Sequence, residues 1–133
     1  SYLASVGMSA NDIAGIIGLS GPYDFYPYDV KATRIAFGDT PAAQSQPVEQ
    51  DLFHMPPMLL ITGHRDHTVY PRNSPRLAEL PPDTKLLEIA DTGHAGTLIA
   101  LGSILTENRE ILAPMSKFLT KHLPAPTKRT DAY

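Results

Sequence analysis

Three short apolar runs, separated by longer mixed segments, dominate the hydrophobic pattern of the chain. The runs cover residues 13–19, 57–62 and 85–90, and each is followed by a turn that contains glycine. Runs of four to eight apolar residues that stop at turn residues are typical of strands buried on both faces of a parallel sheet. We therefore predict an α/β fold with about three parallel strands and crossover helices, in which each strand runs into a loop.

Two further segments predict helices that connect and cover this sheet. Residues 71–80 are compatible with a short crossover helix, because two prolines follow directly and would end it. Apolar residues between 104 and 119 recur at helical spacing and predict a closing helix over the sheet. Pro114 falls inside that pattern, so we expect it either to kink the helix or to mark its start.

The rest of the chain divides into an excursion and a tail. Residues 26–52 contain three prolines and a polar stretch around one apolar turn, which indicates an excursion or cap over the sheet edge. Residues 124–133 are polar and contain prolines, so they predict a flexible tail. We therefore assign 1–123 to one domain or part of one.

Composition narrows the class of protein. The chain has 133 residues, 42% of them hydrophobic, and a net charge of -3 with both signs scattered along it. No basic stripe is available for nucleic acid or an anionic membrane surface, and no apolar run is long enough to span a bilayer. The absence of cysteine excludes disulfides and thiolate metal sites. The cytosol and the periplasm both stay open as locations for a soluble protein, with the cytosol slightly favoured.

Two loops that follow predicted strands carry residues suited to acid–base chemistry. Ligands of open parallel sheets bind beyond the carboxyl ends of the strands, where loops converge. Asp66 lies just past the second predicted strand and His94 just past the third. A carboxylate beside an imidazole fixes its tautomer and stabilises the imidazolium that forms when the ring takes a proton from a hydroxyl nucleophile. We predict that Asp66 orients His94, which acts as the base. The alternative is that Asp66 caps a helix and His94 is an ordinary turn residue.

The surroundings of these two residues resemble a known family. The segments Gly18–Phe25, Pro56–Val69 with Pro71 and Asn73-Ser74, and Gly93-His94 are similar to α/β-hydrolase esterases, namely those related to hormone-sensitive lipase and the feruloyl-esterase-like carboxylesterases. The resemblance extends to about Leu123. It implies that the chain is the C-terminal portion of an α/β-hydrolase fold.

The resemblance also implies a mechanism. The family's catalytic acid falls on Asp66 and its catalytic histidine on His94, in the chain order that an α/β-hydrolase requires. A small-molecule ester is the expected substrate, and the reaction proceeds through an acyl-enzyme without a metal or organic cofactor. Ser20, Tyr23 and Asp24 follow the first predicted strand and are candidates for the substrate pocket.

The sequence departs from the family at the nucleophile. No Gly-x-Ser-x-Gly turn occurs in the chain, and Ser20 is one residue out of register for one. We expect the nucleophile and the oxyanion-hole donors to lie upstream of Ser1 in a longer parent protein, so that this chain alone is inactive. A sheet that lacks its preceding strand has an open edge, and we expect association with the missing N-terminal half or with a second copy.

Two other functions stay open. His64, Asp66 and His67 are closely spaced and resemble part of a metallo-β-lactamase signature, which would make the protein a metal-dependent hydrolase. Thr62 stands where that signature needs its first histidine. The chain would instead be a non-catalytic binding module if the fold had been retained without the chemistry.

Overall fold

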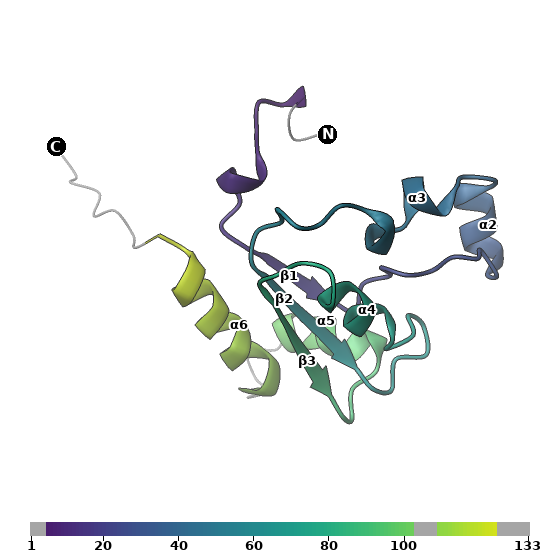
Figure 1. The fold of residues 1–133 in the computed structure, drawn as a ribbon. Helices are drawn as coiled ribbons and strands as arrows, with labels where there is room; N and C mark the ends of the chain where they lie inside the picture. Colours follow the sequence, from purple (N-terminus) through teal and green to yellow (C-terminus); the bar gives the residue numbers. More distant parts are fainter. Residues whose placement is uncertain (1–4, 103–108, 125–133) are drawn as a thin grey trace, which may run out of the picture.

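The computed structural model describes residues 5–102 and 109–124, and it contains an open parallel sheet (Figure 1). The strands β1 (Ile16–Leu19), β2 (Met58–Gly63) and β3 (Thr84–Ile89) lie side by side in sequence order. Both pairings are parallel, so all three strands end at the same edge. The predicted α/β class with a parallel sheet is confirmed. The predicted tail, beyond Pro124, and the predicted start of the closing helix lie outside the described residues.

The first strand is shorter and more exposed than its sequence predicted. Every residue of the central strand β2 is buried, whereas β1 is half-buried because, among the described strands, it pairs with β2 alone. The prediction of a strand over 13–19 is wrong for its first three residues. Within that part, Gly15 packs so closely on the helix α6 (Arg109–His122) that a Cβ there would lie 2.8 Å from the Phe118 ring.

A hydrophobic cluster covers each face of the sheet, because successive residues of a strand point to opposite faces. On one face the short helix α4 (Asn73–Ala78) contributes Leu77, which packs against Met58 and Leu60. On the other face α6 packs on the sheet, and the buried members of that cluster are Leu59, Ile61, Ile89, Ile111 and Phe118. The sheet is therefore a middle layer between helices.

The closing helix α6 (Arg109–His122) contains Pro114 in its interior. The alternative in which this proline marks the start of the helix is therefore wrong. Pro114 is half-buried, and it lines a small cavity between α6 and the amino ends of β2 and β3. None of the described helices is long and apolar enough to cross a lipid bilayer.

The connection between β1 and β2 holds two short helices, α2 (Lys31–Phe37) and α3 (Ala42–Ser45), and the 3-10 turn Pro47–Glu49. Figure 1 shows α2 and α3 displaced from the sheet, on the side toward which the strands run. The helix α5 (His94–Gly102) follows β3 and contacts β2 and α6. Two groups of helices therefore follow the carboxyl ends of the strands, α2 with α3 after β1 and α5 after β3.

Replacing Ile61 by alanine should lower the free energy of unfolding by about 2–5 kcal/mol, because the side chain is fully buried in the α6-side cluster. The matched control is Ile35→Ala on α2, where 76% of the residue is exposed. That change should stay within about 0.5 kcal/mol. Urea unfolding of both variants measures the difference, and equal losses would show that the sheet centre is not the core.

Candidate active site

The structure brings Asp66 and His94 together at the carboxyl edge of the sheet. The Nδ1 atom of His94 lies 2.9 Å from Oδ2 of Asp66, a hydrogen bond in which the protonated Nδ1 donates. Asp66 is buried, and about one third of the His94 side chain is exposed. Within the described residues no hydrogen bond occupies Nε2, the other ring nitrogen. The ring is thus held at one end and available at the other.

The loop after β2 wraps its backbone around the Asp66 carboxylate. The backbone N–H groups of Thr68 and Val69 donate to Oδ1 at 2.9 and 2.8 Å. Burial alone would raise the pKa of Asp66, but the hydrogen bonds from Val69, His94 and Thr68 together outweigh it. The pKa is therefore below its ordinary value of 3.8. Asp66 is a fixed negative charge next to the imidazole.

The loop that carries His94 is fastened to the Asp66 loop by its backbone. The N–H of Arg65 donates to the carbonyl of Thr92 at 3.0 Å. Gly63, the last residue of β2, approaches that same carbonyl so closely that a Cβ would overlap it. A larger residue at 63 would therefore push the two loops apart, which gives this glycine a direct role in the site.

A second chain of hydrogen bonds holds the backbone of His94 in place. Thr97, one turn along α5, donates its hydroxyl to the His94 carbonyl at 2.9 Å, and the same hydroxyl lies 3.1 Å from the hydroxyl of Ser20. Both residues are buried. Ser20 has a positive φ of 46°, and its N–H donates to the Ile61 carbonyl at 2.8 Å. Ser20 thus joins the end of β1 to the first turn of α5, and in the described part of the chain no hydrogen bond links it to the His94 ring.

The metal alternative finds no arrangement to support it. Among the residues that the structure describes, no three His, Asp or Glu side chains gather closely enough to hold an ion. His64 turns toward Glu88, with Nε2 3.2 Å from Oε1, and His67 is exposed. Both oxygens of Asp66 are already engaged. The tight turn after β2 sends these three side chains in different directions.

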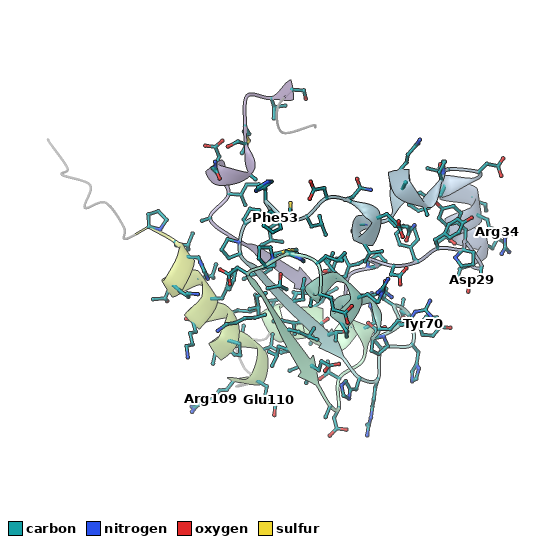
Figure 2. All side chains as sticks on the ribbon, in the orientation of Figure 1. Asp29, Arg34, Phe53, Tyr70, Arg109 and Glu110 are labelled. Atoms are coloured by element: carbon teal, nitrogen blue, oxygen red, sulfur yellow. The ribbon has the colours of Figure 1, made fainter. Side chains whose placement is uncertain are left out.

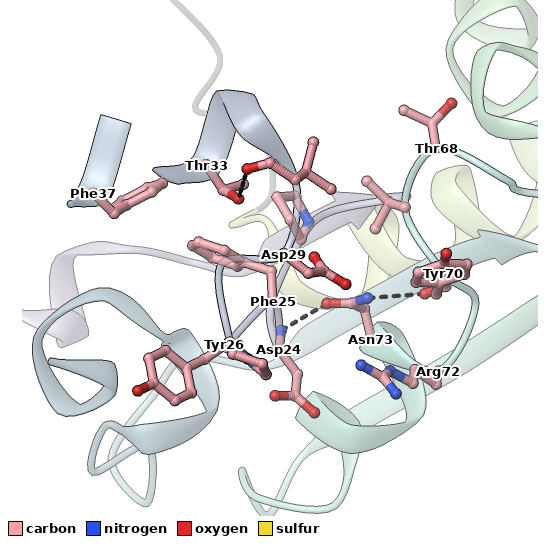
Figure 3. Close-up of a pocket in the computed structure, with 14 residues that line it drawn as sticks. Asp24, Phe25, Tyr26, Asp29, Thr33, Phe37, Thr68, Tyr70, Arg72 and Asn73 are labelled. Atoms are coloured by element: carbon pink, nitrogen blue, oxygen red, sulfur yellow. Dashed lines mark hydrogen bonds between the residues drawn. The ribbon is translucent and has the colours of Figure 1, made fainter. Parts of the chain in front are cut away.

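A cavity of about 340 Å³ adjoins the loop 64–69, which follows β2, carries Asp66 and is called the acid loop below. The cavity lies between segments 22–37 and 68–73 (Figure 3). Asp24 lines this cavity, whereas Ser20 and Tyr23 are not among its lining residues. Tyr23 packs on the α4-side cluster, and burial raises the pKa of its hydroxyl. Phe25, Thr68, Val69 and Asn73 also line the cavity and stand in the segments that resemble the esterases, whereas the lining residues between 27 and 37 were not predicted for the pocket.

The stability of the chain should depend on pH through Asp66. Because its pKa is lower in the folded chain than the ordinary 3.8, the unfolded chain binds the proton more tightly. The stabilisation is present above pH 4 and is lost as the pH falls through the folded-state value. Urea unfolding of the wild type and Asp66→Asn should therefore give free energies that converge on acidification. A constant difference between pH 7 and pH 3 would contradict this.

Replacing Thr97 by valine should cost about 1–3 kcal/mol, because it leaves the buried Ser20 hydroxyl without its partner. The matched control is Thr120→Val on α6, where an exposed threonine makes a similar bond to the Ser116 carbonyl. That control should change the free energy of unfolding by less than about 0.5 kcal/mol. Equal effects of the two substitutions would show that the Ser20–Thr97 contact contributes nothing.

Comparison with known proteins adds no family assignment to this geometry. A scan against protein-family models finds no match, and a search of curated proteins finds none either. The functional conclusion is therefore drawn from the residues and their arrangement.

Proposed function

We propose that this chain supplies the acid and the base of a serine hydrolase of the carboxylesterase type. The observation that carries the proposal is the hydrogen bond between the buried Asp66 carboxylate and Nδ1 of His94, whose side chain is partly exposed. This arrangement leaves Nε2 as the proton acceptor and stabilises the positive charge that the ring acquires. A surface histidine without a buried carboxylate has no partner that fixes its tautomer or stabilises its positive charge.

The reaction of an ester would use the His94 ring four times. Nε2 takes the proton of a serine hydroxyl as its oxygen attacks the ester carbonyl carbon, and then gives that proton to the departing alcohol oxygen. The acyl group is now bound to the serine. Nε2 next takes a proton from a water that attacks the acyl carbon, and returns it to the serine oxygen as the carboxylic acid leaves. Asp66 stays ionised throughout.

The proposal needs a nucleophilic serine in addition to the Asp66–His94 pair. Ser20, which directly follows β1, is buried, and its hydroxyl is hydrogen-bonded to the hydroxyl of Thr97. Within the described residues no serine hydroxyl bonds to His94. We propose that residues preceding Ser1 in the gene product carry the serine and the oxyanion-hole donors.

The open side of β1 offers a place for that preceding part. Ile16 and Ser20 direct their N–H groups to β2, so the alternation of a parallel strand turns the backbone of Ile17 and Leu19 to the open side. A strand added there would end at the same edge as Asp66 and His94. A second copy of this chain is the competing occupant.

A binding module without catalysis is the second candidate, and the cavity beside the acid loop favours it. A ligand site needs only that cavity, whereas hydrolysis also needs Asp66 and His94. Substitutions of Asp66 or His94 distinguish the two functions, because they should abolish hydrolysis but not ligand binding in the cavity.

The test is ester hydrolysis by the complete gene product, with any residues that precede Ser1. We expect a short-chain chromogenic ester to be cleaved and a fluorophosphonate to label one serine. His94→Ala and Asp66→Asn should each lower kcat/KM by roughly a thousandfold or more, because the base or its tautomer is lost.

Two neighbouring exposed residues provide matched controls. His64→Ala removes an imidazole that contacts Glu88, and Asp91→Asn removes a carboxylate that pairs with Arg65. Both variants should keep rates within about threefold of the wild type, because neither side chain contacts the pair. A complete gene product that cleaves no ester, or wild-type rates in the Asp66 and His94 variants, would overturn the proposal in favour of the binding module.

A further inference from the structure

The cavity beside the acid loop has walls that two buried amides hold in place. The Asn73 side chain is buried, and its oxygen accepts from the backbone N–H groups of Tyr23 and Asp24 at 2.8 and 2.6 Å. Its NH2 group donates to the Tyr70 carbonyl at 3.0 Å, so the amide of Asn73 links the start of segment 22–37 to segment 68–73 (Figure 3). Buried polar groups fully satisfied in this way rigidify a structure, so the cavity exists before a ligand arrives.

Gln46 holds the far end of the same wall. It is buried, and its side-chain oxygen accepts from the Phe25 N–H at 2.6 Å. Phe25 in turn packs against Phe37 of α2, with ring centroids 5.1 Å apart, and Tyr28 stacks on Phe37 behind them. Phe25 and Phe37 both line the cavity. Their rings present flat apolar surfaces that suit another ring.

Two carboxylates, those of Asp24 and of the exposed Asp29, interrupt this apolar lining. Figure 3 shows the Asp29 side chain pointing into the cavity between Phe25 and Asn73, and Figure 2 places it beside Arg34 and across from Tyr70. Arg34 donates to the backbone carbonyl of Asp29, and within the described residues no hydrogen bond or ion pair uses the carboxylate itself. It is therefore a hydrogen-bond acceptor that a ligand can use.

Several other polar groups around the cavity already have partners. Thr33 donates its hydroxyl to the Val30 carbonyl at 2.8 Å, and both ends of the Asn73 amide are used. The Asp24 carboxylate lies 3.8 Å from Arg76, and the Arg72 guanidinium stands over the Tyr70 ring at 5.9 Å. Of the two lining carboxylates, that of Asp29 is thus the one without an ion pair among the described residues.

The acid loop connects this cavity to the proposed active site. Thr68 and Val69 line the cavity, and the backbone N–H groups of the same two residues hold the Asp66 carboxylate. A group that fills the cavity therefore lies against the loop that fixes the acid, which in turn holds His94.

We propose that the cavity binds a ring-bearing group that carries a hydrogen-bond donor, which the Asp29 carboxylate accepts. The group is the acyl or alcohol part of an ester substrate, and this last statement rests on the proposed function. A volume of about 340 Å³ suits one substituted ring.

Binding to this chain tests the cavity without any catalysis. The probes are 4-methylphenol and 4-methylanisole, which share a ring and a methyl group but differ in the donor. In an NMR titration we expect the phenol to bind about fivefold more tightly, because only it can donate to the carboxylate. Asp29→Ala should abolish that preference, whereas Asp39→Ala, the same change outside the cavity lining, should keep it.

A blocking variant adds an independent check. Val30 is exposed at the cavity lining, so Val30→Trp should fill the space and weaken binding of both probes. Equal affinity of the two probes for the wild type, or an unchanged preference in Asp29→Ala, would overturn the role of Asp29. Shifts that map outside residues 22–37 and 68–73 would overturn the cavity as the site.

Hydrolysis by the complete gene product separates this inference from the proposed function. The matched substrates are methyl 4-hydroxyphenylacetate and methyl 4-methoxyphenylacetate. A higher kcat/KM for the first, lost in Asp29→Ala and kept in Asp39→Ala, supports the inference. Cleavage of both esters at equal kcat/KM contradicts it and leaves the hydrolase proposal standing. Selective binding with no cleavage of either ester supports the cavity and contradicts the hydrolase proposal.

Discussion

A buried carboxylate needs hydrogen-bond donors, and the donors that Asp66 finds determine the arrangement of this end of the sheet. The backbone of Thr68 and Val69 turns inward to supply two of them, and His94 supplies the third. The loop that follows therefore points its side chains outward, where they form one wall of the cavity. One constraint thus links the orientation of the imidazole to the presence of a ligand-sized space.

The supports of this pair come from all three strands. Gly63 at the end of β2 meets the Thr92 carbonyl in the loop after β3, and Ser20 at the end of β1 meets Thr97 in α5. These contacts are short, buried and mostly made by the backbone or by small hydroxyl groups. Parallel strands that end in register make such a convergence possible, because the three loops leave the sheet at one edge.

The sequence predicted the parts that depend on local patterns. The second and third strands were found because their apolar runs stop at turn residues, and the proximity of Asp66 and His94 followed from parallel strand ends. The cavity could not be predicted in this way. Asn73 reaches back 50 positions to Tyr23, and Gln46 reaches 21 positions to Phe25. Contacts of this kind leave no periodic signal, and the close approach of Gly15 to Phe118 of α6 is another example.

The central claim is that Asp66 sets the tautomer of the His94 ring, that is, which of the two ring nitrogens carries the proton of the neutral form. A nitrogen-15 NMR spectrum of the histidine side chains at neutral pH tests it most directly. The account predicts that neutral His94 carries its proton on Nδ1 in the wild type, and that Asp66→Asn moves it to Nε2 because the amide can donate to Nδ1. A wild-type ring protonated on Nε2, or one tautomer shared by both proteins, would contradict the account.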